Sequence, residues 1–186
     1  MALIIIGIII LVLIIFGAIY FGIYNGLIVS QQNVSEKWAA VEVQYQRRVD
    51  LIPNLVSTVK GAGNYEASTL TKITELRSQW QAASTVDQKV ATANELESTL
   101  SKLLITYENY PQLTATQAYI DLTAQLEGTE NRVAFARGEY NTAVKNYNIQ
   151  VMAFPSNIVA SMMGLSEKKY FESQSGTDAV VQVDFG

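Results

Sequence analysis

The sequence predicts an all-α membrane protein, in which an N-terminal transmembrane helix precedes an antiparallel up-and-down bundle of four long helices. The first 24 residues carry no charge and are almost continuously apolar. Apolar residues then recur at helical spacing along a chain that has only three prolines. An alternating strand pattern occurs only in the last few residues. We expect the anchor in residues 1–29, the bundle in 30–155, and a short helix with an extended tail in 156–186.

The apolar run over residues 3–24 is long enough to cross a bilayer. About 22 helical residues rise roughly 33 Å, against a hydrocarbon core of about 30 Å. A secretory signal peptide would have a basic n-region and a shorter apolar run. No Lys or Arg precedes this run, so we expect an uncleaved single-pass anchor in the cell membrane. The first basic residue, Lys37, favours a cytoplasmic body by the positive-inside rule.

Composition excludes several classes of function. The chain has no Cys and no His, which excludes disulfides, thiolate chemistry, Cys/His zinc sites and His-based catalytic triads. The net charge of −4 argues against nucleic-acid binding. Phosphate-cradling glycine loops, the Gly-x-Ser-x-Gly motif and di-metal carboxylate spacing are absent from the sequence. We expect no enzyme activity, no metal and no cofactor.

The first two bundle helices each show one apolar seam. The first is expected to continue the anchor as one rod, with a local kink at Pro53. Glycines at 61 and 63 end it, and Asn64 is a suitable N-cap for the second. The seams consist of Val34, Trp38, Val41, Tyr45, Arg48, Ile52, Leu55 and Val59 in the first helix, and Leu70, Ile73, Leu76 and Trp80 in the second.

The third and fourth helices are also predicted from one apolar seam each. Ser84 or Thr85 starts the third, and Pro111 lies in the first turn of a long fourth helix that ends near Pro155. The second and third helices together are about as long as the fourth. An alternative arrangement is therefore a bundle of three long arms, in which the second and third helices form one broken middle arm. The inward residues are Val86, Val90, Ala93, Leu96, Leu100, Leu103 and Tyr107, then Leu122, Leu126, Thr129, Val133, Ala136, Tyr140, Ala143 and Tyr147.

A short apolar helix is expected after Pro155, capped by Ser156 or Asn157 and stopped by Gly164. The basic and aromatic residues 168–171 that follow either contact anionic headgroups or form a solvated turn.

Two features suit contacts with other protein chains. Ala18, Gly22 and Gly26 form a small-xxx-small run that lets helix backbones approach closely in lipid. Val183 and Phe185 lie in a terminal extended motif that either docks on a neighbour as an added strand or is disordered. The first feature predicts a homo-oligomer.

Arg48 lies on the apolar seam of the first bundle helix and needs a partner, because an uncompensated buried charge costs several kcal/mol. Glu130 on the fourth helix is the natural candidate. The two residues are level in the three-arm arrangement and within about 9 Å along the axis in the four-helix one.

Four groups of residues form a specific pattern along the chain. They are Arg47, Arg48, Asp50, Pro53 and Asn54; Thr129, Glu130, Asn131, Arg132 and Arg137; Tyr140 and Asn141; and Phe154 and Pro155. With this pattern, from the anchor to the terminal Val-Asp-Phe, the chain resembles the LemA family. The resemblance implies a single-pass bacterial membrane protein with a four-helix up-and-down bundle, and relatives linked to specialised internal membranes. It leaves the activity open, and residues 83–115 carry no motif of the family.

Two functions follow as hypotheses. The leading one is a non-enzymatic, membrane-anchored scaffold that self-associates and organises membrane or membrane proteins. The alternative is an adaptor or regulator of a membrane-bound partner such as a protease or sensor kinase, with residues 168–185 as its recognition element. Deleting that tail would abolish partner capture in the second case and spare assembly in the first.

Overall fold

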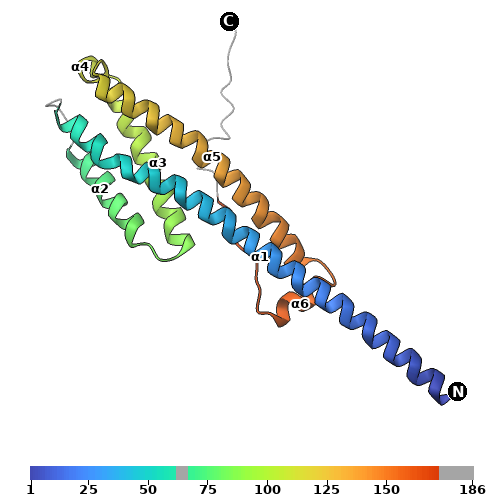
Figure 1. Ribbon diagram of the computed structural model, residues 1–186. Helices are drawn as coiled ribbons and strands as arrows, with labels where there is room; N and C mark the ends of the chain where they lie inside the picture. Colours follow the sequence, from blue (N-terminus) through green and yellow to red (C-terminus); the bar gives the residue numbers. More distant parts are fainter. Residues whose placement is uncertain (62–66, 172–186) are drawn as a thin grey trace, which may run out of the picture. The chain divides into compact units, whose positions relative to one another are not determined.

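The computed structural model describes residues 1–61 and 67–171, and these residues are helical with no strand among them (Figure 1). The all-α prediction is therefore confirmed for this part of the chain. The chain divides into two compact units. Among the described residues, the first unit contains 1–41 and 136–170, and the second contains 42–61, 67–135 and 171.

Helix α1 (Ala2–Gly61) is a single helix of 60 residues with Pro53 inside it, as the sequence predicted. Among the described helices, it alone has a segment long and apolar enough to cross a membrane. That segment is not buried in the protein, so it is compatible with a single-pass membrane anchor. The expected seam of α1 is buried, except that Trp38 is half-buried.

Helices α2 (Ala67–Ala82) and α3 (Val86–Tyr107) pack side by side in the second unit (Figure 1). The up-and-down bundle requires this packing, whereas a broken middle arm would place the two helices end to end. The four seam residues predicted for α2 are its buried residues. Asn64, the expected cap of α2, lies outside the described residues.

The start of α3 is fixed by a capping box. The backbone N–H of Gln88 donates to the Thr85 hydroxyl over 3.2 Å, and the Gln88 side chain accepts from the Thr85 N–H over 3.3 Å. Of the two predicted caps, Thr85 is the one used. The expectation that Val86 points inward was wrong: it is exposed, because it lies in the first turn ahead of the buried face.

The expected long fourth helix is interrupted near its start. A short helix, α4 (Pro111–Thr114), precedes the long helix α5 (Gln117–Met152). Thr116 explains the interruption: its hydroxyl donates to the Leu113 carbonyl over 2.7 Å and accepts from the Tyr119 N–H over 3.3 Å. Such local bonds by a threonine side chain compete with a continuing helix. The inward residues predicted for α5, from Leu122 to Tyr147, are all buried.

Helix α6 (Ser156–Met162) is the predicted short apolar helix. Ser156 is its first residue rather than its cap, because the Ser156 hydroxyl donates backward to the carbonyls of Gln150 and Ala153. Gly164 ends the helix in the left-handed region, with φ of 68°. The Leu165 N–H then donates to the Ala160 carbonyl over 2.9 Å, which is the bond of a Schellman motif. The predicted glycine stop is therefore confirmed.

Candidate functional site

The second unit contains a cluster of charged and polar side chains in its interior. Arg48 on α1 contacts Glu97 on α3, with 3.3 Å between Nη1 and Oε1. The same guanidinium forms an ion pair through Nη2 with Glu130 on α5. The Tyr45 hydroxyl donates to Oε1 of Glu97 over 2.7 Å. Three helices are thereby joined around one guanidinium group, and we call these four residues the Arg48 cluster.

Burial decides which carboxylate matters most to Arg48. The side chains of Arg48 and Glu97 are 7% and 9% exposed, whereas that of Glu130 is 48% exposed. A buried charge without compensation costs several kcal/mol, while a water-exposed partner contributes roughly 0–1 kcal/mol. Arg48 Nε has no hydrogen-bond partner among the described residues. Glu97 therefore supplies the main compensation for the buried guanidinium.

Aromatic rings surround the Arg48 cluster. The Tyr45 ring lies 5.0 Å from that of Trp80 on α2, and 6.1 Å from that of Phe171 in a nearly parallel stack. The Lys89 ammonium lies 5.4 Å from the centre of the Trp80 ring and forms an ion pair with Glu42. Large rings on this side exclude water, which strengthens the electrostatic contacts inside.

Sequence reasoning paired Arg48 with Glu130, and the structure places them in contact. It missed Glu97. The signal was present, since Glu97 follows the buried Ala93 by four residues and precedes the buried Leu100 by three, which puts it on the same helix face. A charged residue on an apolar seam is the same feature that singled out Arg48.

The geometry of the Arg48 cluster gives it a structural role. Both carboxylates contact the guanidinium, and the Tyr45 hydroxyl donates to Glu97, so these groups are held in fixed contacts. Over residues 1–61 and 67–171, no group of three or more His, Cys, Asp or Glu side chains is placed to hold a metal ion. The cluster fixes the register of α1, α3 and α5 within the second unit.

The second unit also has an open groove of about 630 Å³ between α1 and α2. Its lining is mainly apolar and hydroxylic, with Lys60 and Glu75 as its charged residues. The hydroxyls of Thr71, Thr74 and Ser78 in this lining each donate to the carbonyl four residues earlier. Their protons are therefore used within α2.

In the first unit, α1 and α5 are joined by an ion pair and a ring contact. Lys37 Nζ lies 3.0 Å from Glu139 Oε2. The ring of Trp38 meets that of Tyr140 edge to face, with 5.6 Å between the centroids. These contacts join α1 to α5 within this unit.

Asn148 on α5 holds the segment after α6. Its amide nitrogen donates to the Lys168 carbonyl and its amide oxygen accepts from the Lys168 N–H, each over 2.8 Å. The Lys168 ammonium lies 5.5 Å from the centre of the Tyr147 ring. Neither a free headgroup-binding patch nor a solvated turn describes residues 168–171 as a whole. Lys168 is half-buried and Phe171 is buried, and only Lys169 and Tyr170 are exposed.

The small-residue face of α1 is open. Ala18, Gly22 and Gly26 are all exposed. A Cβ added at Gly22 or Gly26 would meet nothing within 4 Å, whereas Leu27 beside them is buried in the first unit. The other predicted docking residues, Val183 and Phe185, lie outside the described part of the chain.

The sequence pattern of the LemA family matches residues 37–185, which is most of the chain. The chain belongs to the LemA family.

Two relatives illustrate the range of this family. The chain is 26% identical over 163 residues to Protein LemA of Metamycoplasma hominis, covering 86% of this chain and 73% of that protein. It is 23% identical over 184 residues to Magnetosome protein MamQ 2 of Paramagnetospirillum magneticum, covering 85% of this chain and 68% of that one.

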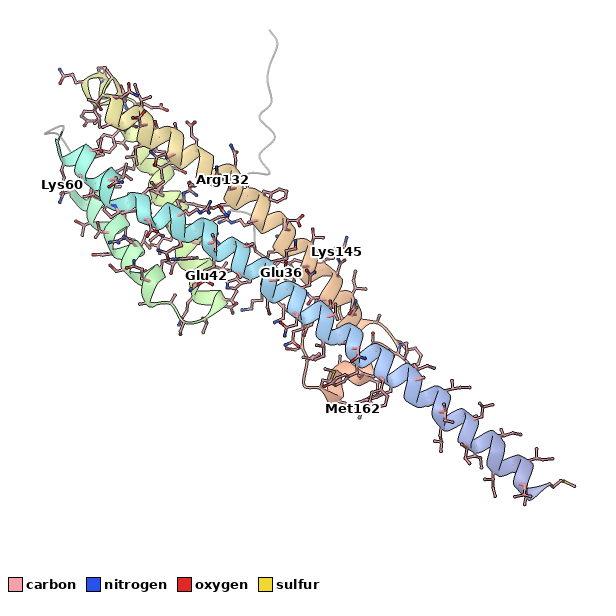
Figure 2. The ribbon with its side chains drawn as sticks, viewed as in Figure 1. Glu36, Glu42, Lys60, Arg132, Lys145 and Met162 are labelled. Atoms are coloured by element: carbon pink, nitrogen blue, oxygen red, sulfur yellow. The ribbon has the colours of Figure 1, made fainter. Side chains whose placement is uncertain are left out.

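The LemA pattern residues divide into an interior set and a surface set. Arg48, Thr129 and Tyr140 are buried, and Arg137 and Asn141 are half-buried. The exposed ones are Arg47, Asp50, Pro53, Asn54, Glu130, Asn131, Arg132, Phe154 and Pro155. Figure 2 shows Arg132 on α5. The buried members contribute to packing, and among the exposed members Glu130 contacts Arg48.

Proposed function

We propose that this LemA-family protein is a membrane-anchored helical scaffold that self-associates through α1 and organises membrane or membrane proteins, without catalysis. The observation that carries the proposal is the exposed face of Ala18, Gly22 and Gly26 within the apolar segment of α1. In lipid, helices associate where small residues let their backbones approach, because lipid-facing apolar side chains alone provide no driving force.

The proposal includes a four-helix up-and-down bundle that carries this anchor. The side-by-side packing of α2 and α3 supports it, as do the contacts of Arg48 on α1 with Glu97 on α3 and Glu130 on α5. We further propose residues 1–29 as the anchor, 30–155 as the bundle and 156–186 as the terminal segment, with the body on the cytoplasmic side of the membrane. The relatives named as magnetosome proteins support a role at an internal membrane.

The test is the mass of the full-length protein in mild detergent, measured by light scattering on a sizing column. Gly22→Leu with Gly26→Leu fills the small-residue face, and a discrete oligomer should then dissociate. Gly17→Leu is the matched control. It adds the same side chain where nothing lies within 4 Å, but on another side of the helix. A full-length protein that is monomeric in detergent and in lipid would remove the basis of the proposal.

For the adaptor alternative, fewer residues are available as a recognition element than expected. Its recognition element was expected to span residues 168–185, but Lys168 is bonded to Asn148 and Phe171 is buried. A partner would therefore recognise the exposed Lys169 and Tyr170 or residues beyond Phe171, including Val183 and Phe185. Deleting residues 173–186 should leave the oligomer intact if the scaffold proposal holds. If the deletion instead prevents crosslinking of the protein to a membrane partner in cells, the adaptor function is favoured.

A further inference from the structure

Helix α6 packs directly on the part of α1 that leads out of the apolar span. Leu27 on α1 is buried together with Val159 and Ala160 on α6. Tyr20 and Ile23 on α1 pack against the same cluster, as do Val151, Met163 and Leu165. Figure 2 shows α6, marked by Met162, beside α1 in the first unit. Since the apolar run ends at residue 24, α6 lies where α1 passes from hydrocarbon to water.

The two chain segments that meet here share one property. Residues 1–35 contain no charged side chain, and neither do residues 146–166. The flanking charges are Glu36 and Lys37 on α1, Lys145 on α5, and Glu167 after α6. Lys37 pairs with Glu139, and Lys145 follows Glu139 by six residues, so charge on α5 extends about 9 Å farther toward α6 than this pair. Lys168 lies beside Tyr147 and Asn148, so the part of the unit without charged residues begins beyond them, in residues 149–165 and in α1 up to residue 35.

The same end exposes large apolar side chains. Phe154, between α5 and α6, is 81% exposed, and Met162 and Ile158 on α6 are 71% and 54% exposed. Ile149 and Met152 near the end of α5 are half or more exposed as well. An exposed apolar surface of this kind on an uncharged background is typical of a site that contacts lipid or protein. Phe154 is also one of the exposed residues of the LemA pattern.

Aromatic residues mark the same level on α1. The rings of Tyr20 and Tyr24 stack with 6.3 Å between their centroids. Tyrosines are enriched where a transmembrane helix passes through the headgroup region. The apolar surface of α6 is thus continuous with the lipid-facing surface of α1 and lies beside its interfacial tyrosines.

We propose that residues 149–165 form a second membrane contact, in which the α5–α6 corner and the outer face of α6 insert into the headgroup and acyl boundary of the bilayer that α1 crosses. The occupant of this surface is lipid, because the surface continues that of the membrane-spanning segment. Phe154, Ile158 and Met162 are its inserting side chains. The anchor and α6 then hold the end of the first unit against the membrane at two points. This inference rests on α1 crossing the bilayer and does not depend on self-association.

The absence of cysteine makes a direct test possible in the full-length protein. Phe154→Cys, Met162→Cys and Thr142→Cys are each labelled with the environment-sensitive fluorophore NBD and reconstituted in phosphatidylcholine vesicles. Thr142 is exposed on α5 in the same unit and serves as the control. It precedes Phe154 by about three helical turns, or roughly 18 Å along the axis.

Labels at 154 and 162 should emit at shorter wavelength than the label at 142. They should lose fluorescence when phosphatidylcholine carrying a doxyl quencher is included, and should be protected from aqueous iodide. The label at 142 should show the reverse. Two results overturn the proposal: emission and quenching at 154 and 162 that match 142, or a short-wavelength emission that doxyl lipid does not quench. The second result would place another protein chain on the surface. Light scattering of the same samples reports self-association separately.

Discussion

Glu97 accepts a hydrogen bond from Tyr45 and contacts Arg48 in the interior of the second unit, where both charged side chains are more than nine-tenths buried. Removing Glu97 leaves a buried guanidinium with one partner that is half in water. We predict that Glu97→Ala lowers the free energy of unfolding by about 3–5 kcal/mol, and Glu130→Ala by about 1 kcal/mol or less. Denaturant unfolding of the full-length protein in mild detergent measures both. Equal losses would contradict the ranking by burial.

The same cluster predicts a pattern of coupling. In a double-mutant cycle, Arg48→Ala with Glu97→Ala should recover part of the stability that Arg48→Ala loses, because the partner is no longer left as an uncompensated charge. Arg48→Ala with Glu130→Ala should recover less. We expect a coupling energy of about 1–3 kcal/mol for the first pair and several-fold less for the second. A coupling energy of zero between Arg48 and Glu97 would show that their contact does not contribute to the stability of the fold.

The buried face of a helix was predicted correctly from the sequence where apolar residues recur with the helical period. The buried residues of α2, and those of α5 from Leu122 to Tyr147, match the heptad positions because one apolar face per helix must be covered. The interruption at Thr116 was not predicted, because it depends on local bonds of one hydroxyl that leave the apolar period unchanged.

The candidate sites were predictable only in part. Arg48 could be identified from the sequence because it is a charged residue on an apolar seam. Its carboxylate partner could not, because the choice between Glu97 and Glu130 depends on how α3 and α5 face Arg48. Residue spacing within one helix does not give that orientation. The small residues Ala18, Gly22 and Gly26 of α1 could be identified from the sequence alone, because their four-residue spacing lies within one helix. The apolar surface at Phe154 and Met162 needed the structure, because its significance comes from the packing of α6 against Leu27.

Asn148 should be essential for the segment that follows α6. Asn148→Ala removes the two hydrogen bonds between its side-chain amide and the Lys168 backbone and should cost about 2 kcal/mol, at roughly 1 kcal/mol per hydrogen bond. The exposed neighbour Asn146→Ala is the control and should change stability by less than about 0.5 kcal/mol. Hydrogen exchange at the Lys168 amide reports the local effect and should accelerate in Asn148→Ala alone. Unchanged protection there would show that other contacts hold this segment.

Alkaline pH should destabilise the protein through Tyr147. Burial raises the pKa of the Tyr147 phenol above its ordinary value of 10.0. Above pH 10 the unfolded chain therefore releases this proton while the folded chain keeps it, so stability falls as pH rises toward the folded pKa. Below pH 10 the Tyr147 phenol is protonated in both the folded and the unfolded chain, so it causes no change in the free energy of unfolding with pH there. Burial raises the pKa of Tyr119 in the same direction, with Glu108 adding to the effect.

Tyr147→Phe removes this ionisation and keeps the ring that Lys168 approaches. The free energy of unfolding of the variant should fall less steeply between pH 9 and 11 than that of the parent protein. Between pH 7 and 9 the two curves should run parallel, which serves as the internal control for any packing change. Urea unfolding in mild detergent at each pH measures both slopes. Parallel curves over the whole range would mean that Tyr147 ionises equally easily in the folded and unfolded chains.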